Sequence, residues 1–321
     1  MEQYFTLLRA ALSGEKSTNE RTGAGTIGVF EQQARFDLKK GFPIVTTKPV
    51  YWKGVVEELL WFLRGETNIR PLLQKNVHIW SSDCLRFNLS TVVKSGLISQ
   101  DEISHAQEAA KDGDYSIAND LIKSYERKIL SDEDFANVNG DLGPVYGAQW
   151  RGTNGALAFD QIKNLESKLT ENNGDRRMIV NAWNPDQIHI MALPPCHISF
   201  QVHVSPESNR LTLGWSQRSC DTVLGVPFNI ASYGLLASLL AHTHNLGLGE
   251  LVGRFADLHI YLPHLPAVNE QLAREPRKLP TLRIITKRSS VTEYTANDIQ
   301  LLDYNPYPKL KNPTPMFGGL F

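Results

Sequence analysis

One stretch of the chain, residues 193–233, limits its fold and its chemistry more than any other. It reads LPPCHISFQVHVSPESNRLTLGWSQRSCDTVLGVPFNIASY. The double proline imposes an extended approach to Cys196, and the alternating residues 198–204 then predict a strand. A Gln-Arg-Ser-Cys-Asp cluster, a turn and a nearly all-apolar helix at 230–240 follow. A thiol, a guanidinium, a carboxylate and an amide therefore fall within one strand-turn-helix unit, which suits an active site for a small anionic substrate.

The composition is that of an ordinary globular protein. Of its 321 residues 41% are hydrophobic, enough for a sizeable core, and the formal net charge of -1 gives no general attraction for nucleic acid or membranes. No apolar run is long enough to span a bilayer, and the N-terminus lacks the apolar core of a signal peptide, so we expect a cytoplasmic protein. Because Cys84, Cys196 and Cys220 show no metal-site spacing, we expect free thiols and no metal.

The periodicity of the remaining chain predicts mixed α and β structure in one domain. A strand is expected at 28–36 and a helix at 50–65. By position alone Glu58 of this helix is expected at the helix edge, reaching solvent, rather than as a catalytic acid, the alternative interpretation. From about 84 to 138 the chain becomes charged and alanine-rich, with helical spacing but few large apolar residues. This segment is interpreted as a helical insertion on the surface.

Several polar residues allow two interpretations. A lone cysteine is usually a small buried hydrophobe, but a guanidinium such as that of Arg218 would make Cys196 a thiolate nucleophile. Tyr146 follows a loop rich in glycine and proline, and it can be hydrogen-bonded core or a proton relay. Arg176 and Arg177 are expected at the start of a strand, where neighbours point to opposite faces, so one of them can serve a partner chain.

In its motifs the chain resembles the thymidylate synthase family over nearly its whole length. The resemblance is carried, in this order, by RTGAGT, GFPIVTTK, ELLWFLRGETNI, GDLGPVYGAQWR, RRMIVNAWN, LPPCH, QRSCD, LGVPFNIASY and DLHIYLPH. It implies an α+β fold, a single catalytic domain over residues 1–321 with the insertion at about 84–138. A large mixed sheet would pack at a homodimer interface and carry helices on its other face.

The resemblance also implies dUMP as the substrate. Cys196 would add to C6 of the pyrimidine and turn C5 into a nucleophile. Asn229, at the opening of the apolar helix, would read the uracil edge through its amide. The phosphate site would combine residues of both subunits, with Arg21, Arg218 and Ser219 from one and Arg176 and Arg177 from the other. The sugar hydroxyl would be bound by His259 and Tyr261.

Methylenetetrahydrofolate is the implied co-substrate, and its implied contacts are Asp221, Trp80 and Ile79. Glu58 matches a carboxylate that organises water and protonates this co-substrate, and Tyr146 matches a tyrosine linked to removal of the C5 proton. His197 would join a water network rather than act as the base for the neighbouring thiol. Cys220 would be structural.

The chain departs from the family pattern around the folate and the C-terminal lid. Ser81 replaces the usual Asp, Ala256 a Gly and Pro263 an Asn, while NPTPMFGGLF extends the C-terminus. A looser lid would admit water, so an alternative function is a dUMP hydroxymethylase of the kind some phages use, acting in the host cytoplasm. A third interpretation is an inactive nucleotide- or RNA-binding homologue. The retained Cys196 and Glu58 and the lack of a basic stripe argue against it.

Overall fold

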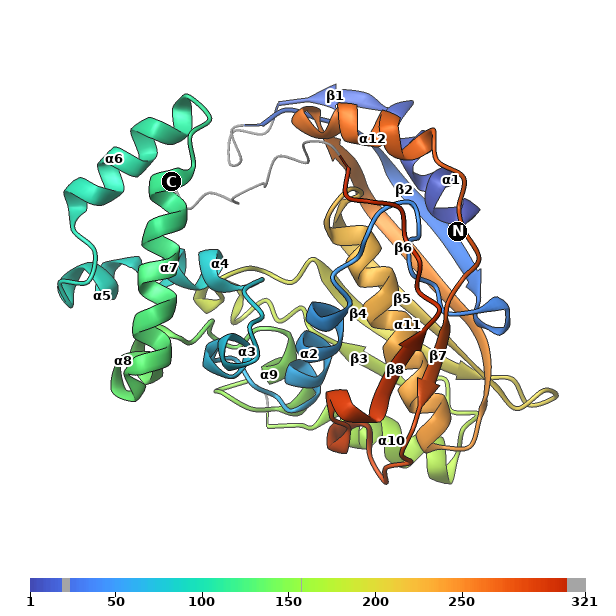
Figure 1. Cartoon of the computed structure of the whole chain (residues 1–321). Coiled ribbons are helices and arrows are strands. Elements are labelled where there is room, and N and C mark those ends of the chain that lie inside the picture. The colour runs from blue at the N-terminus through green and yellow to red at the C-terminus, as the bar shows by residue number, and fades with distance from the viewer. Residues whose placement is uncertain (19–23, 157, 311–321) are drawn as a thin grey trace.

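A computed structural model describes residues 1–321 except 19–23, 157 and 311–321. Its centre is a six-stranded mixed sheet in the order β1-β2-β6-β5-β4-β3 (Figure 1). The strands of this sheet are β1 Glu15–Ser17, β2 Thr26–Asp37, β3 Ile179–Asn181, β4 His197–Val204, β5 Arg210–Asp221 and β6 Gly247–Tyr261. Only β5 and β6 pair in parallel among these described strands. β7 Thr281–Ile284 and β8 Ile299–Leu302 form a separate two-stranded sheet.

Helices cover one face of the sheet and build the region beside it. The α-helices are α1 Glu2–Leu12, α2 Trp52–Leu63, α3 Arg70–Gln74, α4 Ser81–Phe87, α5 Leu89–Lys94, α6 Gln100–Lys111, α7 Ser116–Ser131, α8 Glu133–Asn139, α9 Tyr146–Arg151, α10 Gln161–Glu171, α11 Gly225–Thr243 and α12 Leu265–Leu272. Short 3-10 turns are η1 Leu38–Lys40, η2 Ile188–Ile190, η3 Leu262–His264, η4 Val291–Glu293 and η5 Ala296–Asp298. This architecture confirms the expected α+β class.

Helix α11 lies at the heart of the core. It connects the parallel strands β5 and β6, as a crossover helix does, and it packs on both of them and on α2. Its leucines and isoleucine at 230–240 are fully buried, which confirms the burial expected from their apolar run. The expected strands at 28–36 and 198–204 are also confirmed, within β2 and β4.

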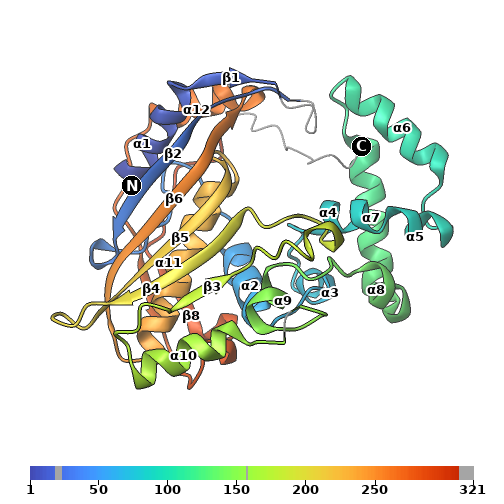
Figure 2. The same ribbon diagram turned by 180° about the vertical axis from the view of Figure 1, so that it is seen from behind.

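The sheet has two unlike faces. Along β4 the side chains of Phe200, Val202 and Val204 are buried, whereas Gln201 and His203 between them are exposed. The buried set lies on the α11 side, since Phe200 contacts Tyr233 of that helix. Seen from behind, the strands lie in front of α11 (Figure 2). Among the described residues, one broad face of the sheet carries no layer of helices (Figure 2).

The segment between α3 and α9 is helical. Helices α4–α8 lie to one side of the sheet (Figure 1). Helices α4 and α7 meet at Cys84 and Tyr125, whose Sγ and Oη are 3.1 Å apart. The division of the chain into one domain with an insertion stays a prediction. No described helix is both long enough and apolar enough to cross a membrane.

Three local expectations are wrong. Glu58 is only 8% exposed, because every residue of α2 from Gly54 to Leu63 is buried and the helix has no solvent-facing edge there. Arg176 and Arg177 lie in a turn that ends before β3 begins at Ile179, so strand alternation does not set their directions. Asn229 lies in the second turn of α11 rather than at its opening, because the helix begins four residues earlier.

Candidate active site

The backbone around Cys196 is fixed from β5. Cys196 immediately precedes β4, and its carbonyl accepts a bond of 2.8 Å from the backbone N–H of Arg218. The Arg218 side chain bonds the two carbonyls before the cysteine, with Nε at 2.9 Å from Pro195 O and Nη2 at 2.8 Å from Pro194 O. The guanidinium also lies 5.4 Å from the Trp183 ring. The prolines and Arg218 together therefore hold one conformation of the chain at the thiol.

The three thiols differ in their surroundings. Cys84 and Cys220 are fully buried, whereas Cys196 is partly exposed. Burial raises the pKa of Cys84 to about 12 and raises that of Cys220 as well. Among the cysteines Cys196 is therefore the one that a substrate can reach, and Cys220 lies in the core as a structural residue would.

Tyr146 and His197 form the wall behind the thiol. The Tyr146 hydroxyl accepts a bond of 2.7 Å from the backbone N–H of Cys196, and its ring stacks on His197 at 4.1 Å. His197 Nδ1 lies 2.7 Å from the Tyr233 hydroxyl, and burial lowers the pKa of His197 to about 3. His197 is therefore neutral at physiological pH and is too weak a base to deprotonate a thiol.

Glu58 is a buried carboxyl group beside this wall. Trp80 Nε1 donates to Glu58 Oε1 at 2.8 Å, and the Trp80 ring contacts both Phe62 and Tyr146. Desolvation raises the pKa of Glu58 to about 8, although the Trp80 bond opposes this rise. A carboxyl that titrates near neutral pH can both donate and accept a proton during a reaction.

A glutamine that the sequence analysis missed orients Asn229. Gln217 Nε2 donates to Asn229 Oδ1 at 3.0 Å and to the backbone carbonyl of Ser219 at 3.0 Å. Gln217 is 4% exposed and shares the α11 side of β5 with Leu213 and Trp215. A buried amide needs hydrogen-bond partners. The position of Gln217 in the alternation of β5, on the same face as core residues, could therefore have indicated a polar contact in the sequence.

The carboxyl ends of the parallel strands bring a second group together. Asp221 of β5 is in register with His259 of β6, and His259 Nδ1 lies 3.1 Å from Asp257 Oδ1. The Tyr261 ring lies edge-on to His259 with 5.2 Å between ring centroids. Strand order thus places the expected sugar-binding pair next to Asp221.

Lys48, also absent from the sequence-based set, stands beside Asp221. Its Nζ donates to the Val223 carbonyl at 2.5 Å, and the backbone N–H of Val223 donates to Asp221 Oδ1 at 2.9 Å. Burial lowers the pKa of Lys48 to about 8, while the charge of Asp221 opposes the shift. Lys48 therefore adds a cation to the Asp221 end of the site.

The other residues expected at the site are Ile79 and three arginines. Ile79 is 38% exposed and precedes Trp80. Arg21 lies outside the described residues. Arg176 and Arg177 are far from their own Cys196, because β3 pairs Ile179 with Gln201 and the arginines continue toward the opposite end of β4.

Two further observations concern the surroundings of this centre. Ser81, one of the departures from the family pattern, is 2% exposed, and its Oγ has no hydrogen-bond partner among the residues that the structure describes. Within the same residues, no cluster of three His, Cys, Asp or Glu side chains could hold a metal ion.

Comparisons with known proteins agree across the chain. The family model described as "Thymidylate synthase" matches residues 2–316. The proteins named "Thymidylate synthase" of Listeria monocytogenes serotype 4b (strain F2365) and Listeria innocua serovar 6a (strain ATCC BAA-680 / CLIP 11262) are each 43% identical to it over 317 residues. Those alignments cover 98% of this chain and 99% of each relative.

Proposed function

Because this chain belongs to the thymidylate synthase family, we propose that it transfers a one-carbon unit from methylenetetrahydrofolate to C5 of dUMP and reduces it to a methyl group. The products are dTMP and dihydrofolate. The family relation and the names of the relatives favour this reductive methylation over hydroxymethylation. The observation that carries the proposal is the reachable thiol of Cys196, held from Arg218 and Tyr146 beside the buried carboxyl of Glu58.

Cys196 acts as the nucleophile in this proposal. Its thiolate forms a bond to C6 of the pyrimidine, and the electron pair of the C5–C6 double bond moves toward C5 and O4. Arg218 supports the thiolate electrostatically and contributes to the phosphate site with Ser219 and Arg21. Asn229, oriented by Gln217, accepts from N3–H and donates to O4, so that the uracil edge is recognised.

Tyr146 and Glu58 carry out the proton transfers of the proposed reaction. Tyr146 takes part in removal of the C5 proton, and Glu58 exchanges a proton with the co-substrate because its pKa is close to the working pH. The co-substrate supplies the methylene carbon and then the hydride that completes the methyl group. His197 remains neutral and orders the hydrogen-bond network with Tyr233.

The remaining contacts follow from position. His259 and Tyr261 bind the sugar hydroxyl. Trp80 and Ile79 give the co-substrate an apolar wall, while Asp221 orients its pterin ring.

The active unit is proposed to be a homodimer. The uncovered face of the sheet provides a broad surface for a second copy of the chain, and Arg176 and Arg177 are displaced from their own thiol along β4. Across such an interface they would reach the phosphate bound by the other subunit. A cytoplasmic location stays a prediction.

The test is to incubate the protein with dUMP and methylenetetrahydrofolate, weigh the nucleotide product, and follow dihydrofolate by absorbance. We expect dTMP and an equal amount of dihydrofolate. Hydroxymethyl-dUMP without dihydrofolate would overturn the proposal in favour of water as the final reactant. No product from dUMP would exclude both reactions.

A further inference from the structure

The turn that carries the two arginines is organised by the residue before them. Asp175 Oδ1 accepts from the Arg177 backbone N–H at 2.7 Å and from Arg177 Nε at 3.0 Å, and Oδ2 accepts from Nη2 at 3.1 Å. Lys168 of α10 donates to the same Oδ2 at 2.5 Å. The Asp175 side chain is 7% exposed, whereas that of Arg177 is 83% exposed. A shielded carboxylate thus holds the base of an exposed guanidinium.

The geometry of the guanidinium decides what this contact leaves free. The group has two edges for a bidentate bond, and Asp175 occupies the Nε–Nη2 edge. The N–H groups of Nη1 and the second N–H of Nη2 form the other edge. Within the described part of the chain, no residue accepts from Nη1. The edge that suits a phosphate is therefore presented outward.

We propose that Asp175, supported by Lys168, is a positioning residue for the phosphate of dUMP: it fixes Arg177 so that the free guanidinium edge meets the phosphate bound by the partner subunit. This inference rests on the proposed function. Asp175 does not position Arg176, the first of the two adjacent arginines, in the same way. Among described residues the Arg176 side chain has no hydrogen bond, and only its backbone carbonyl is bonded, by Gln201 Nε2 at 3.1 Å.

The energetic effect of Asp175 has two parts of opposite sign. Ordering a free arginine side chain costs rotamer entropy, and a guanidinium already held in place avoids much of that cost on binding. A carboxylate beside the site also weakens the attraction for phosphate. Lys168 offsets this second part because its ammonium pairs with the same oxygen. We therefore expect the saved entropy of Arg177 to outweigh the repulsion between Asp175 and the phosphate, so that removing Asp175 weakens dUMP binding.

The protonation state of Asp175 is consistent with this arrangement. Bonds from Arg177 and from Lys168 hold the pKa of Asp175 well below its usual range. The carboxylate is therefore ionised at neutral pH, where it can pair with both Arg177 and Lys168.

The experiment compares nucleotide with nucleoside. Calorimetry on the full-length protein measures binding of dUMP and of deoxyuridine, which lacks the phosphate, to the unmodified chain and to Asp175→Ala. We expect about tenfold weaker dUMP binding in the variant, the equivalent of roughly 1.4 kcal/mol, with deoxyuridine binding unchanged. In turnover, the KM for dUMP rises by the same factor and kcat changes little.

Two further variants separate positioning from a general effect on the turn. Asp175→Asn retains an oxygen for the Arg177 backbone N–H but has no charge to hold the guanidinium, so we expect it to show most of the loss. Glu171→Ala removes an exposed carboxylate from the end of α10, the helix that carries Lys168. It is the matched charge control, and we expect unchanged dUMP binding. Wild-type affinity in Asp175→Asn, or equal loss of dUMP and deoxyuridine binding in Asp175→Ala, would overturn the inference.

Mixed dimers distinguish failure of this inference from failure of the proposed function. In a dimer of a Cys196→Ala subunit and an Asp175→Ala subunit, the surviving thiol receives Arg177 from the subunit that retains Asp175. A normal KM for dUMP supports the positioning role across the interface, and a KM as high as that of the Asp175→Ala homodimer contradicts it. Absence of dTMP from the unmodified protein, with dUMP binding still dependent on Asp175, would instead reject the proposed reaction alone.

Discussion

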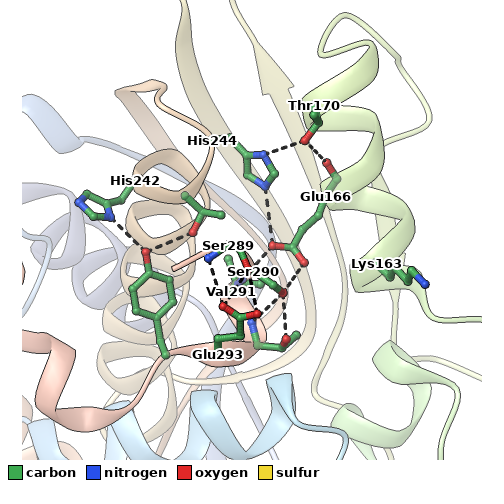
Figure 3. Close-up of polar contacts among 12 residues, drawn as sticks. Lys163, Glu166, Thr170, His242, His244, Ser289, Ser290, Val291 and Glu293 are labelled. Atoms are coloured by element: carbon green, nitrogen blue, oxygen red, sulfur yellow. Dashed lines mark hydrogen bonds and ion pairs between the residues drawn. The ribbon is translucent and has the colours of Figure 1, made fainter. Parts of the chain in front are cut away.

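Helix α11 carries buried polar clusters near both of its ends, and they differ in how fully their hydrogen bonds are made inside the chain. Asn229 near its N-terminal end and Tyr233 at its middle face the candidate active site, where Glu58 receives the Trp80 bond and no ion pair among the described residues. At its C-terminal end His244 faces Glu166 of α10 (Figure 3). The first cluster belongs to the proposed reaction site, and the second joins structural elements.

Glu166 is the more fully bonded of the two carboxyl groups. Its Oε1 accepts from the Val291 backbone N–H and its Oε2 from the Ser290 hydroxyl, both at 2.8 Å. His244 Nε2 lies 3.7 Å from Oε1, and its Nδ1 lies 3.3 Å from the Thr170 hydroxyl (Figure 3). Glu166 therefore ties α10, the end of α11 and η4 together.

The difference shows how the surroundings divide buried carboxyl groups by task. Desolvation dominates at Glu58 and raises its pKa to about 8. At Asp298, in the C-terminal segment, burial also acts to raise the pKa, but bonds from Arg288 and Thr295 hold it at about 2. A well-bonded carboxylate keeps its charge and fixes structure, whereas a sparsely bonded one is ready to exchange a proton.

The largest effect is expected at the thiol. Cys196→Ala removes the nucleophile and should lower turnover by at least about a thousandfold while dUMP binding remains measurable by calorimetry. The matched control is Cys84→Ala, which removes a buried thiol that lies 3.6 Å from the Asn139 carbonyl and should retain turnover. Ordinary turnover in the Cys196 variant would contradict the assignment of the nucleophile.

The next largest effect is expected at Glu58. Glu58→Gln keeps a group of similar shape beside Trp80 but cannot transfer a proton, and turnover should fall by about 10²–10³ in a steady-state assay. Turnover within a factor of two of the unmodified protein would show that the sparse bonding of Glu58 serves no proton transfer.

The Glu58→Gln variant is expected to be more stable than the unmodified protein although its turnover is lower. The pKa of Glu58 is raised from 4.5 to about 8 in the folded protein, so between those values the folded state holds a proton that the unfolded state releases. Stability of the unmodified protein should therefore fall as pH rises from about 4.5 to 8 through this group, and Glu58→Gln should gain relative stability over that range. Thermal unfolding of both proteins at pH 5 and pH 8 measures the difference. The lowered pKa of His197 affects both proteins alike and cancels.

A smaller effect, on stability alone, is expected at the other end of α11. Glu166→Ala deprives the Val291 N–H and the Ser290 hydroxyl of their acceptor, which should cost about 2–3 kcal/mol in denaturant unfolding with turnover at 25 °C retained. Lys163→Ala is the control, because this exposed residue of α10 points away from the cluster (Figure 3) and should stay within about 0.5 kcal/mol. Loss of turnover in folded Glu166→Ala would break the contrast between the two ends.

The smallest effect is expected on base selection. Asn229→Asp leaves an oxygen for Gln217 Nε2 but changes the donor and acceptor pattern offered to the pyrimidine, so the preference for dUMP over dCMP should fall by about tenfold. The ratio of kcat/KM for the two nucleotides measures this directly. An unchanged ratio would show that Asn229 does not read the base.

Sequence patterns predicted the elements of the site better than the surroundings of its residues. The proline pair, the alternation after Cys196 and the apolar run of α11 follow from local chemistry, and the structure confirms them. The burial of Glu58 could not be read in this way, because α2 packs between α11 and α9 and both of its flanks are covered by segments distant in sequence. Gln217 was missed for a related reason, since its role depends on a partner twelve residues away on another element.

By itself the sequence determined the fold class, the family and the residue types of the reaction centre. These depend on periodicity and on ordered motifs, which local steric and hydrophobic preferences fix along the chain. Only the tertiary structure decided which carboxyl group is desolvated, which cysteine is reachable and which edge of Arg177 stays free. Those properties depend on the atoms that surround each group, and the surrounding atoms come from segments that the fold brings together across long separations in sequence.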